Sequence, residues 1–135
     1  MKIKREIIKR IIAQAKKDAP IEACGYLASK AGIVAKHYEM TNINKSQEHF
    51  SFAPEEQFEV VKDARAQGLE ICAVYHSHPS TGARPSGEDI ELAYDSNISY
   101  VIVSLSGGSE VVKSFKIINS KVEEENLEVI DDERI

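Results

Sequence analysis

The stretch LEICAVYHSHPSTGARPSGEDIELA, residues 69–93, contains the three patterns that decide the fold. Its first ten residues are almost continuously apolar, which predicts a central strand covered on both faces. A loop rich in proline, glycine and serine follows. From Ser86 to about Ser96 the pattern predicts a helix with acidic residues in its first turn. A buried strand, a wide loop and a helix in this order favour an α/β protein.

The rest of the 135-residue chain extends this pattern in both directions. Apolar residues at helical spacing predict a first helix over residues 3–15, and a second helix begins at Pro54 and ends before Gly68. Further strands are predicted at 21–29, 31–40, 50–52, 99–105, 110–118 and 121–130. We therefore expect a single domain over residues 1–135, a mixed, curved β-sheet flanked by about three helices.

Composition narrows the classes of function. The formal net charge of −5 disfavours a nucleic-acid partner. No apolar run approaches the length that spans a membrane, and the basic N-terminus lacks the apolar stretch of a targeting peptide. Cys24 and Cys72 are far apart, with no metal-type spacing, and are interpreted as reduced thiols. These features predict a cytoplasmic protein.

Two histidines stand at the end of the central strand. Residues two apart on a strand point to the same face, so His76 and His78 project together, roughly 6–7 Å apart at their Cα atoms. Two imidazoles at that separation can bind one ion. The alternative is a pair of surface histidines, because a short H-x-H pattern arises easily by chance.

Asp89 lies in the first turn of the helix that follows the loop. The loop is wide enough for the helix to fold back and bring this carboxylate beside the imidazoles. Two histidines and one aspartate leave a tetrahedral Zn²⁺ one open position, where water has a pKa of roughly 7. The alternative is a capping box with Ser86 as N-cap. A Ser86 hydroxyl engaged in the cap is not expected to serve catalysis at the same time.

The residues around the two histidines match a known signature. The sequence HSHP at residues 76–79, followed by Ser86 and Asp89, resembles the metalloprotease motif of the JAMM/MPN+ domain. Glu22 in PIEACGYL, residues 20–27, matches the upstream glutamate that this family carries before Cys-Gly. The resemblance spans nearly the whole chain, which is similar in length and element order to a small, stand-alone prokaryotic member. It implies an MPN, deaminase-like fold.

The resemblance also implies a role for each matched residue. His76, His78 and Asp89 would bind one Zn²⁺ per chain. Glu22 would accept a proton from the attacking water and donate one to the leaving amine. Ser86 would help to stabilise the developing oxyanion. Taken alone, Glu22 would be interpreted as an exposed carboxylate near a helix end.

Members of this family hydrolyse peptide or isopeptide bonds, commonly after the C-terminal Gly-Gly of ubiquitin-like proteins. Small bacterial forms act on sulfur-carrier proteins of the same β-grasp fold. The resemblance therefore implies a zinc-dependent hydrolase with such a substrate. Two alternatives are a non-catalytic MPN scaffold and a RadC-like protein, although the helical nucleic-acid module usual in RadC-like chains is absent. The sequence leaves the oligomeric state open, a homodimer included.

The cysteines have a second interpretation. Strand alternation puts Cys24 on the same face as Glu22, and Cys72 on the same face as His76. If the two strands are neighbours, both thiols would lie near the metal site. Cys24 would then contact substrate or support the site, with plain core packing as the alternative.

Overall fold

The computed structural model of the chain describes residues 1–131. The last four residues of the predicted domain, 132–135, lie outside the described residues. The helices are α1 (Arg5–Asp18), α2 (Pro54–Ala66) and α3 (Gly87–Glu91), with a short 3₁₀ helix η1 (Ser106–Gly108). The strands are β1 (Lys2–Lys4), β2 (Cys24–Lys30), β3 (Ile33–Met40), β4 (Glu70–His78), β5 (Ser99–Ser104), β6 (Val111–Ile118), β7 (Lys121–Glu125) and β8 (Glu128–Ile130).

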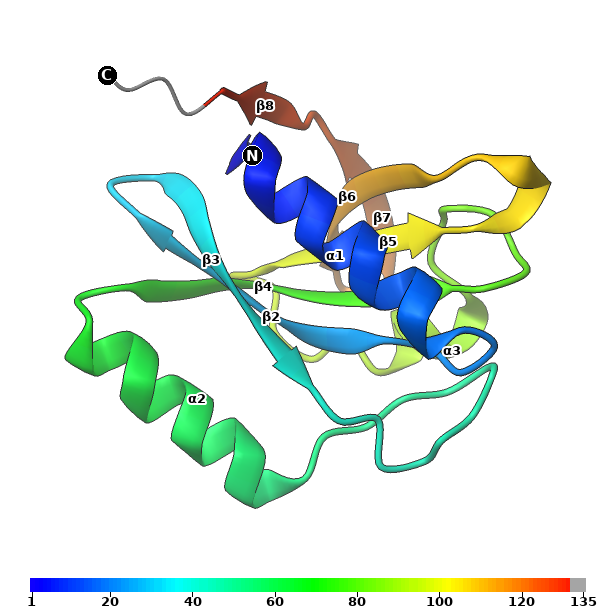
Figure 1. The fold of residues 1–135 in the computed structure, drawn as a ribbon, viewed down its shortest axis with the longest axis horizontal. Coiled ribbons are helices and arrows are strands. Elements are labelled where there is room, and N and C mark those ends of the chain that lie inside the picture. Colours follow the sequence, from blue (N-terminus) through cyan, green and yellow to red (C-terminus); the bar gives the residue numbers. More distant parts are fainter. Residues whose placement is uncertain (132–135) are drawn as a thin grey trace.

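All eight strands form one twisted sheet in the order β7-β6-β5-β4-β2-β3-β1-β8 (Figure 1). The predicted central strand is confirmed, because β4 pairs antiparallel with β2 and parallel with β5. A parallel pair needs a crossover connection, and here residues 79–98 provide it. This crossover contains α3 and starts at the carboxyl end of β4, where the two histidines stand. The predicted mixed α/β architecture with three helices is confirmed.

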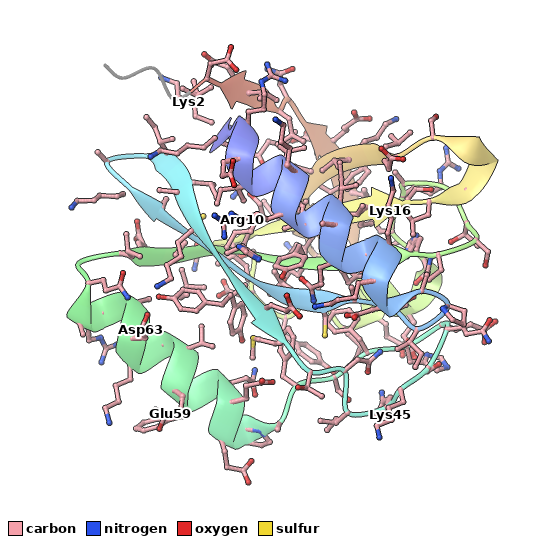
Figure 2. The ribbon with its side chains drawn as sticks, in the orientation of Figure 1. Lys2, Arg10, Lys16, Lys45, Glu59 and Asp63 are labelled. Atoms are coloured by element: carbon pink, nitrogen blue, oxygen red, sulfur yellow. The ribbon has the colours of Figure 1, made fainter. Side chains whose placement is uncertain are left out.

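Helix α1 covers one face of the sheet (Figure 1). Its side chains Ile7, Ile11 and Ala15 are buried against that face. The strand residues in the same cluster are Leu27, Val34, Ala73, Tyr75, Val101 and Val103. Burying each isoleucine contributes about 1.5–3 kcal/mol. Charged residues such as Arg10 and Lys16 lie on the outer, exposed side of α1 (Figure 2).

Four predicted elements differ from the structure. The single strand predicted at 121–130 is two strands, β7 and β8, which stand at opposite ends of the strand order. The chain forms β1 before the first helix, so Ile3 belongs to a strand that pairs with β3 and β8 rather than to the helix. Residues 50–52 are not a strand, because Phe50 and Phe52 pack as loop residues over the sheet. Helix α3 ends at Glu91 rather than near Ser96. The pairing of β1, the separation of β8 from β7 and the packing of Phe50 come from contacts between residues distant in sequence.

A β-bulge corrects the prediction for Cys72. Leu27 pairs with Ala73 but Ala28 pairs with Ile71, so Cys72 is the extra residue on β4. The bulge reverses the alternation, and Cys72 packs against the α1 side of the sheet, away from His76. The prediction that β2 and β4 are neighbours is confirmed, whereas the expected proximity of Cys72 to the metal site is wrong.

Within residues 1–131, no helix combines the length and the apolar character needed to cross a membrane.

Candidate metal centre

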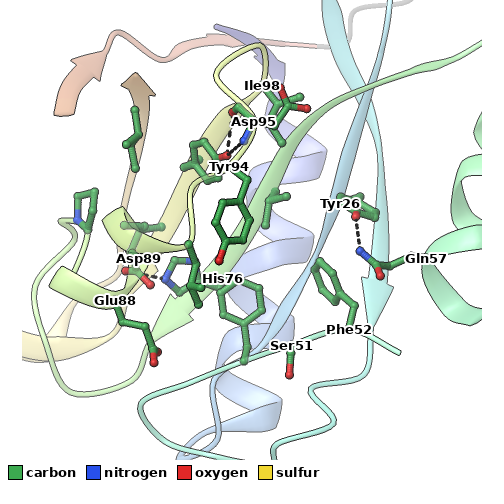
Figure 3. A pocket seen from close by; sticks show the side chains of 17 residues that line it. Tyr26, Ser51, Phe52, Gln57, His76, Glu88, Asp89, Tyr94, Asp95 and Ile98 are labelled. Carbon is green, nitrogen blue, oxygen red and sulfur yellow. Dashed lines mark hydrogen bonds and ion pairs between the residues drawn. The ribbon is translucent and has the colours of Figure 1, made fainter. Parts of the chain in front are cut away.

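The two histidines at the end of β4 are buried on the face of the sheet opposite α1. Their Nε2 atoms are 3.1 Å apart, and each lies 3.1 Å from Oδ2 of Asp89 in α3 (Figure 3 shows His76 and Asp89). The crossover between β4 and β5 therefore folds α3 back over the strand end. His76, His78 and Asp89 come together as the sequence predicted.

Three ligand atoms at these separations fit a zinc ion. Zinc bonds of about 2.0–2.1 Å in a tetrahedral site place ligand atoms about 3.3 Å apart. The nearly equilateral triangle of two nitrogens and one oxygen forms one face of such a tetrahedron and leaves the fourth position free for water or substrate. Two imidazoles and one carboxylate also form the donor set typical of catalytic zinc.

The ring of His78 is oriented by the loop that follows β4. Its Nδ1 lies 2.9 Å from the carbonyl oxygen of Gly82 and donates a hydrogen bond to it. In a neutral imidazole, this leaves the lone pair of Nε2 free for a metal ion. The ring of His76 stacks on Phe50, with centroids 4.7 Å apart and an interplanar angle of 25°. Both ligand rings are thus held by packing or hydrogen bonding.

Asp89 combines the two roles that the sequence presented as alternatives. Its Oδ2 accepts a hydrogen bond from the Ser86 amide at 2.9 Å, and its own amide donates to Ser86 Oγ at 3.0 Å. This is a complete capping box, and the same Oδ2 faces both histidines. In the metal-free protein, burial favours the neutral acid, but hydrogen bonds donated by Nε2 of His76 and His78 outweigh it and hold the pKa of Asp89 well below its usual range. The cap fixes the carboxylate that faces the histidines.

The Ser86 hydroxyl is an N-cap that accepts the Asp89 amide, as the sequence predicted. A hydroxyl has one donor hydrogen and two acceptor lone pairs, and the cap occupies one lone pair. The donor hydrogen remains free to bond to a substrate oxygen. The expectation that capping and catalysis exclude each other is therefore too strict.

Glu22 is a buried carboxylate just before β2, with 4 % of its surface exposed. Its Oε1 is the only buried side-chain oxygen or nitrogen in residues 1–131 without a hydrogen-bond partner. Burial raises the pKa of Glu22 to about 8, and the charges of His78 and Asp89 also act on it. The interpretation of Glu22 as an exposed carboxylate is wrong. A buried acid with an unsatisfied oxygen beside a metal-type cluster indicates a functional group.

A cavity of about 490 Å³ adjoins the cluster, with His76 and Asp89 in its wall (Figure 3). Its apolar lining includes Tyr26, Phe50, Phe52, Tyr94, Tyr100 and Ile102. No local pattern in the sequence identifies this lining, because these residues come from four separate segments. The aromatic residues of the loop at 50–52 were the one available signal.

Glu88, which lines the same cavity, makes a further contact. His49 Nδ1 lies 2.5 Å from Glu88 Oε1, which joins the loop before α2 to α3. Nothing in the sequence around His49 singles it out.

Cys24 pairs with His76 across the β2–β4 ladder. Its side chain is completely buried, and its thiol lies 3.9 Å from the Met40 carbonyl oxygen. Burial raises the pKa of this thiol to about 12, so it is neutral. The structure favours plain packing for Cys24.

Comparisons with known proteins agree with this site. A CysO-cysteine peptidase of Mycobacterium tuberculosis is 31% identical over 132 residues, which cover 96% of this chain and 90% of the relative. A desampylase of Pyrococcus furiosus is 30% identical over 98 residues, 73% of this chain and 70% of the relative. A solved structure described as a JAMM metalloprotease-like zinc site in the proteasome and signalosome superposes with a TM-score of 0.61. The two chains are 26% identical, and the matched region covers 96% of this chain and 97% of the other.

The fold, the cluster of His76, His78 and Asp89, and these relatives define a zinc metallopeptidase of the JAMM type. Residues 4–118 match the family described as prokaryotic homologs of the JAB domain. The chain belongs to this family. The alternative of a non-catalytic MPN scaffold does not agree with relatives that are peptidases.

Proposed function

We propose that this metallopeptidase hydrolyses the peptide or isopeptide bond after the C-terminal Gly-Gly of a ubiquitin-like or sulfur-carrier protein of β-grasp fold. The observation that carries the proposal is the convergence of three metal-type ligand atoms beside a buried carboxylate that lacks a partner. The names of the CysO-cysteine peptidase and the desampylase support this substrate class.

His76, His78 and Asp89 would hold a single Zn²⁺ through Nε2, Nε2 and Oδ2. A zinc ion bound there supplies a Lewis acid that makes hydroxide available near neutral pH. Phe50 and the Gly82 carbonyl keep the two imidazoles in position for this task. The Ser86 amide does the same for Asp89.

Glu22 would be the general base and acid. Its carboxylate accepts a proton from the attacking water and then donates that proton to the leaving nitrogen as the C–N bond breaks. The raised pKa suits a group that must both accept and release a proton near neutral pH. Because Oε1 has no protein partner, it is free to receive the proton.

Ser86 would stabilise the transition state. Its hydroxyl hydrogen is not used by the cap and can be donated to the oxygen of the scissile carbonyl as negative charge develops. The adjoining apolar cavity would receive an extended segment of the substrate beside the ligands.

The remaining expectations complete the proposal. Residues 1–135 would be one catalytic domain, acting in the cytoplasm on a protein substrate and on neither nucleic acid nor membrane. Cys24 and Cys72 are free thiols, which suits a reducing compartment. The oligomeric state, a homodimer included, stays an open prediction.

The test is mass spectrometry of a β-grasp protein that carries an extension after its Gly-Gly, before and after incubation with the protein. We expect loss of the extension, inhibition by a chelator and recovery with zinc. The variant His78→Ala is expected to lose both zinc and activity. Full cleavage in the presence of chelator, or one full equivalent of zinc in His78→Ala, would contradict the proposal.

A further inference from the structure

Glu22 lies two residues before β2 begins, so the regular strand ladder does not hold its backbone. One oxygen of its carboxyl group also has no partner. The position of the side chain must therefore come from what holds the peptide groups on either side of it.

Ser77, between the two histidines, holds the peptide group after Glu22. Its amide donates to the Ala23 carbonyl at 2.9 Å, and its Oγ accepts the Ala23 amide at 2.7 Å. In a regular antiparallel pair of this type both bonds join backbone groups. Here the serine hydroxyl replaces the carbonyl, so β2 stays attached to β4 where the ladder ends. Ser77 is 1% exposed.

Asn42 holds the other end of this same peptide group, the Glu22 carbonyl. Its Nδ2 donates to the Glu22 carbonyl at 3.1 Å and to the His49 carbonyl at 2.8 Å. Its Oδ1 accepts the Asn44 amide at 3.0 Å, so the buried amide side chain is satisfied. The Glu22 amide in turn donates to the Ser46 carbonyl at 2.9 Å. The loop before α2 is thus tied directly to Glu22.

We propose that Ser77 and Asn42 are positioning residues that fix the Glu22 carboxylate relative to the His76, His78 and Asp89 cluster. The inference rests on the proposed role of Glu22 as the base. Ser77 ties Glu22 to the strand that carries both histidines, and Asn42 ties it to the loop that packs on His76. Misplacing a catalytic group by about 1 Å can cost about 10²-fold in rate.

The first test compares Ser77→Ala with Ser114→Ala. Ser114 is as buried as Ser77 and also makes a hydrogen bond through its hydroxyl, which the alanine variant would lose. It lies on β6, however, and its bond is to Glu125. We expect Ser77→Ala to lower kcat about 10–100-fold, with KM and zinc content within twofold of wild type. Ser114→Ala is expected to keep kcat, and Ser77→Thr, which retains the hydroxyl, to recover part of the loss.

A double-mutant cycle separates positioning from general damage to the structure. In the Glu22→Gln background the base is already absent, so Ser77→Ala is expected to change the residual turnover less than twofold. A loss of the same size in both backgrounds would show that Ser77 acts independently of Glu22 and would overturn the inference.

Metal-free protein offers a readout that does not depend on activity. We expect amide hydrogen exchange at Ala23 to be at least 10-fold faster in Ser77→Ala, with exchange at Phe115 unchanged. Asn42→Ala is expected to lower kcat as Ser77→Ala does, whereas Asn44→Ala, which leaves both Asn42 donor bonds intact, is not. Unchanged Ala23 exchange together with wild-type kcat in Ser77→Ala would overturn the inference.

The role of Glu22 as the base and the roles of Ser77 and Asn42 as positioning residues are tested separately. Wild-type turnover in Glu22→Gln would remove the proposed base and this inference with it. An inactive Glu22→Gln beside a fully active Ser77→Ala and Asn42→Ala would leave the proposed function intact and remove the positioning roles alone.

Discussion

Glu22, which is buried just before β2, and Glu125, which is partly buried on β7, have pKa values shifted in opposite directions. Glu125 on β7 accepts hydrogen bonds from Ser99 Oγ at 2.7 Å and Ser114 Oγ at 2.8 Å, and its Oε2 lies 3.6 Å from the N-terminal ammonium. Burial opposes ionisation, but these hydroxyls and the ammonium outweigh it and lower the pKa of Glu125. Glu22 has an oxygen without a partner, and burial raises its pKa to about 8.

The contrast separates a structural carboxylate from a functional one. Where a buried acid only supports the fold, its oxygens are satisfied and its charge is stabilised. Where a buried carboxylate oxygen is left without a partner, its burial destabilises the folded protein, and a functional role is the expected reason for keeping it. Four measurements test whether Glu22 and Glu125 divide in this way.

The largest expected effect is on turnover. Glu22→Gln keeps the size of the side chain but removes the group that accepts the proton, so kcat is expected to fall about 10³–10⁴-fold. Zinc content should not change. Glu125→Gln, the matched control, is expected to keep wild-type kcat. Measured kcat values and metal analysis of both variants decide this, and equal losses would erase the distinction between the two carboxylates.

The second effect is on stability against pH in metal-free protein. The pKa of Glu22 is raised on folding, so its stabilising contribution is complete below the usual value of 4.5 and is lost as pH rises to about 8. We expect this loss to be about 2–4 kcal/mol. Urea unfolding of wild type and Glu22→Gln at several pH values measures it. A constant difference between them would show that the Glu22 pKa is not raised.

The third effect is a dependence of stability on pH with the opposite sign, at Glu125. Its pKa is lowered on folding, so its contribution is present above about 4.5 and is lost as pH falls towards the lower folded value. Glu125→Gln is expected to reduce the free energy of unfolding at pH 7 by about 1–3 kcal/mol, because this carboxylate is only partly buried. Denaturant titration at pH 7 and pH 4 checks it. A destabilisation that grows towards pH 4 would contradict it.

The smallest effect isolates one hydrogen bond. Ser99→Ala removes one of the two hydroxyls that bond to Glu125 and is expected to cost about 1 kcal/mol at pH 7 without a change in kcat. Thermal unfolding and a turnover assay measure both. A loss of turnover in Ser99→Ala would connect Glu125 to catalysis and would contradict its assignment as a structural carboxylate.

Much of the fold could be predicted from local patterns. The apolar run that becomes β4 and the helical spacing of α1 are properties of short segments, and both elements appear where expected. Strand β1 and the bulge at Cys72 could not be predicted, because they depend on pairing with distant strands. Helix α3 was expected to extend to about Ser96 but ends at Glu91.

In the candidate site, too, local patterns identify some of the residues and miss the others. The histidines follow from strand periodicity, and the pattern around Ser86 and Asp89 follows from the rules of helix capping. Glu22 was found only through resemblance to a family, since a single glutamate in an apolar segment carries no local sign of a catalytic role. The supporting residues Ser77 and Asn42 act through backbone groups far away in sequence, so no local pattern identifies them.

The sequence by itself determined which donor atoms are present and on which secondary structures they stand, because periodicity and capping operate over a few residues. Only the tertiary structure decided that three of those atoms lie within 4.8 Å of one another. It also decided that Glu22 is buried with an unpaired oxygen and that an apolar cavity opens beside His76 and Asp89. Proximity and burial depend on how segments distant in sequence pack against one another, and no short stretch of sequence specifies that packing.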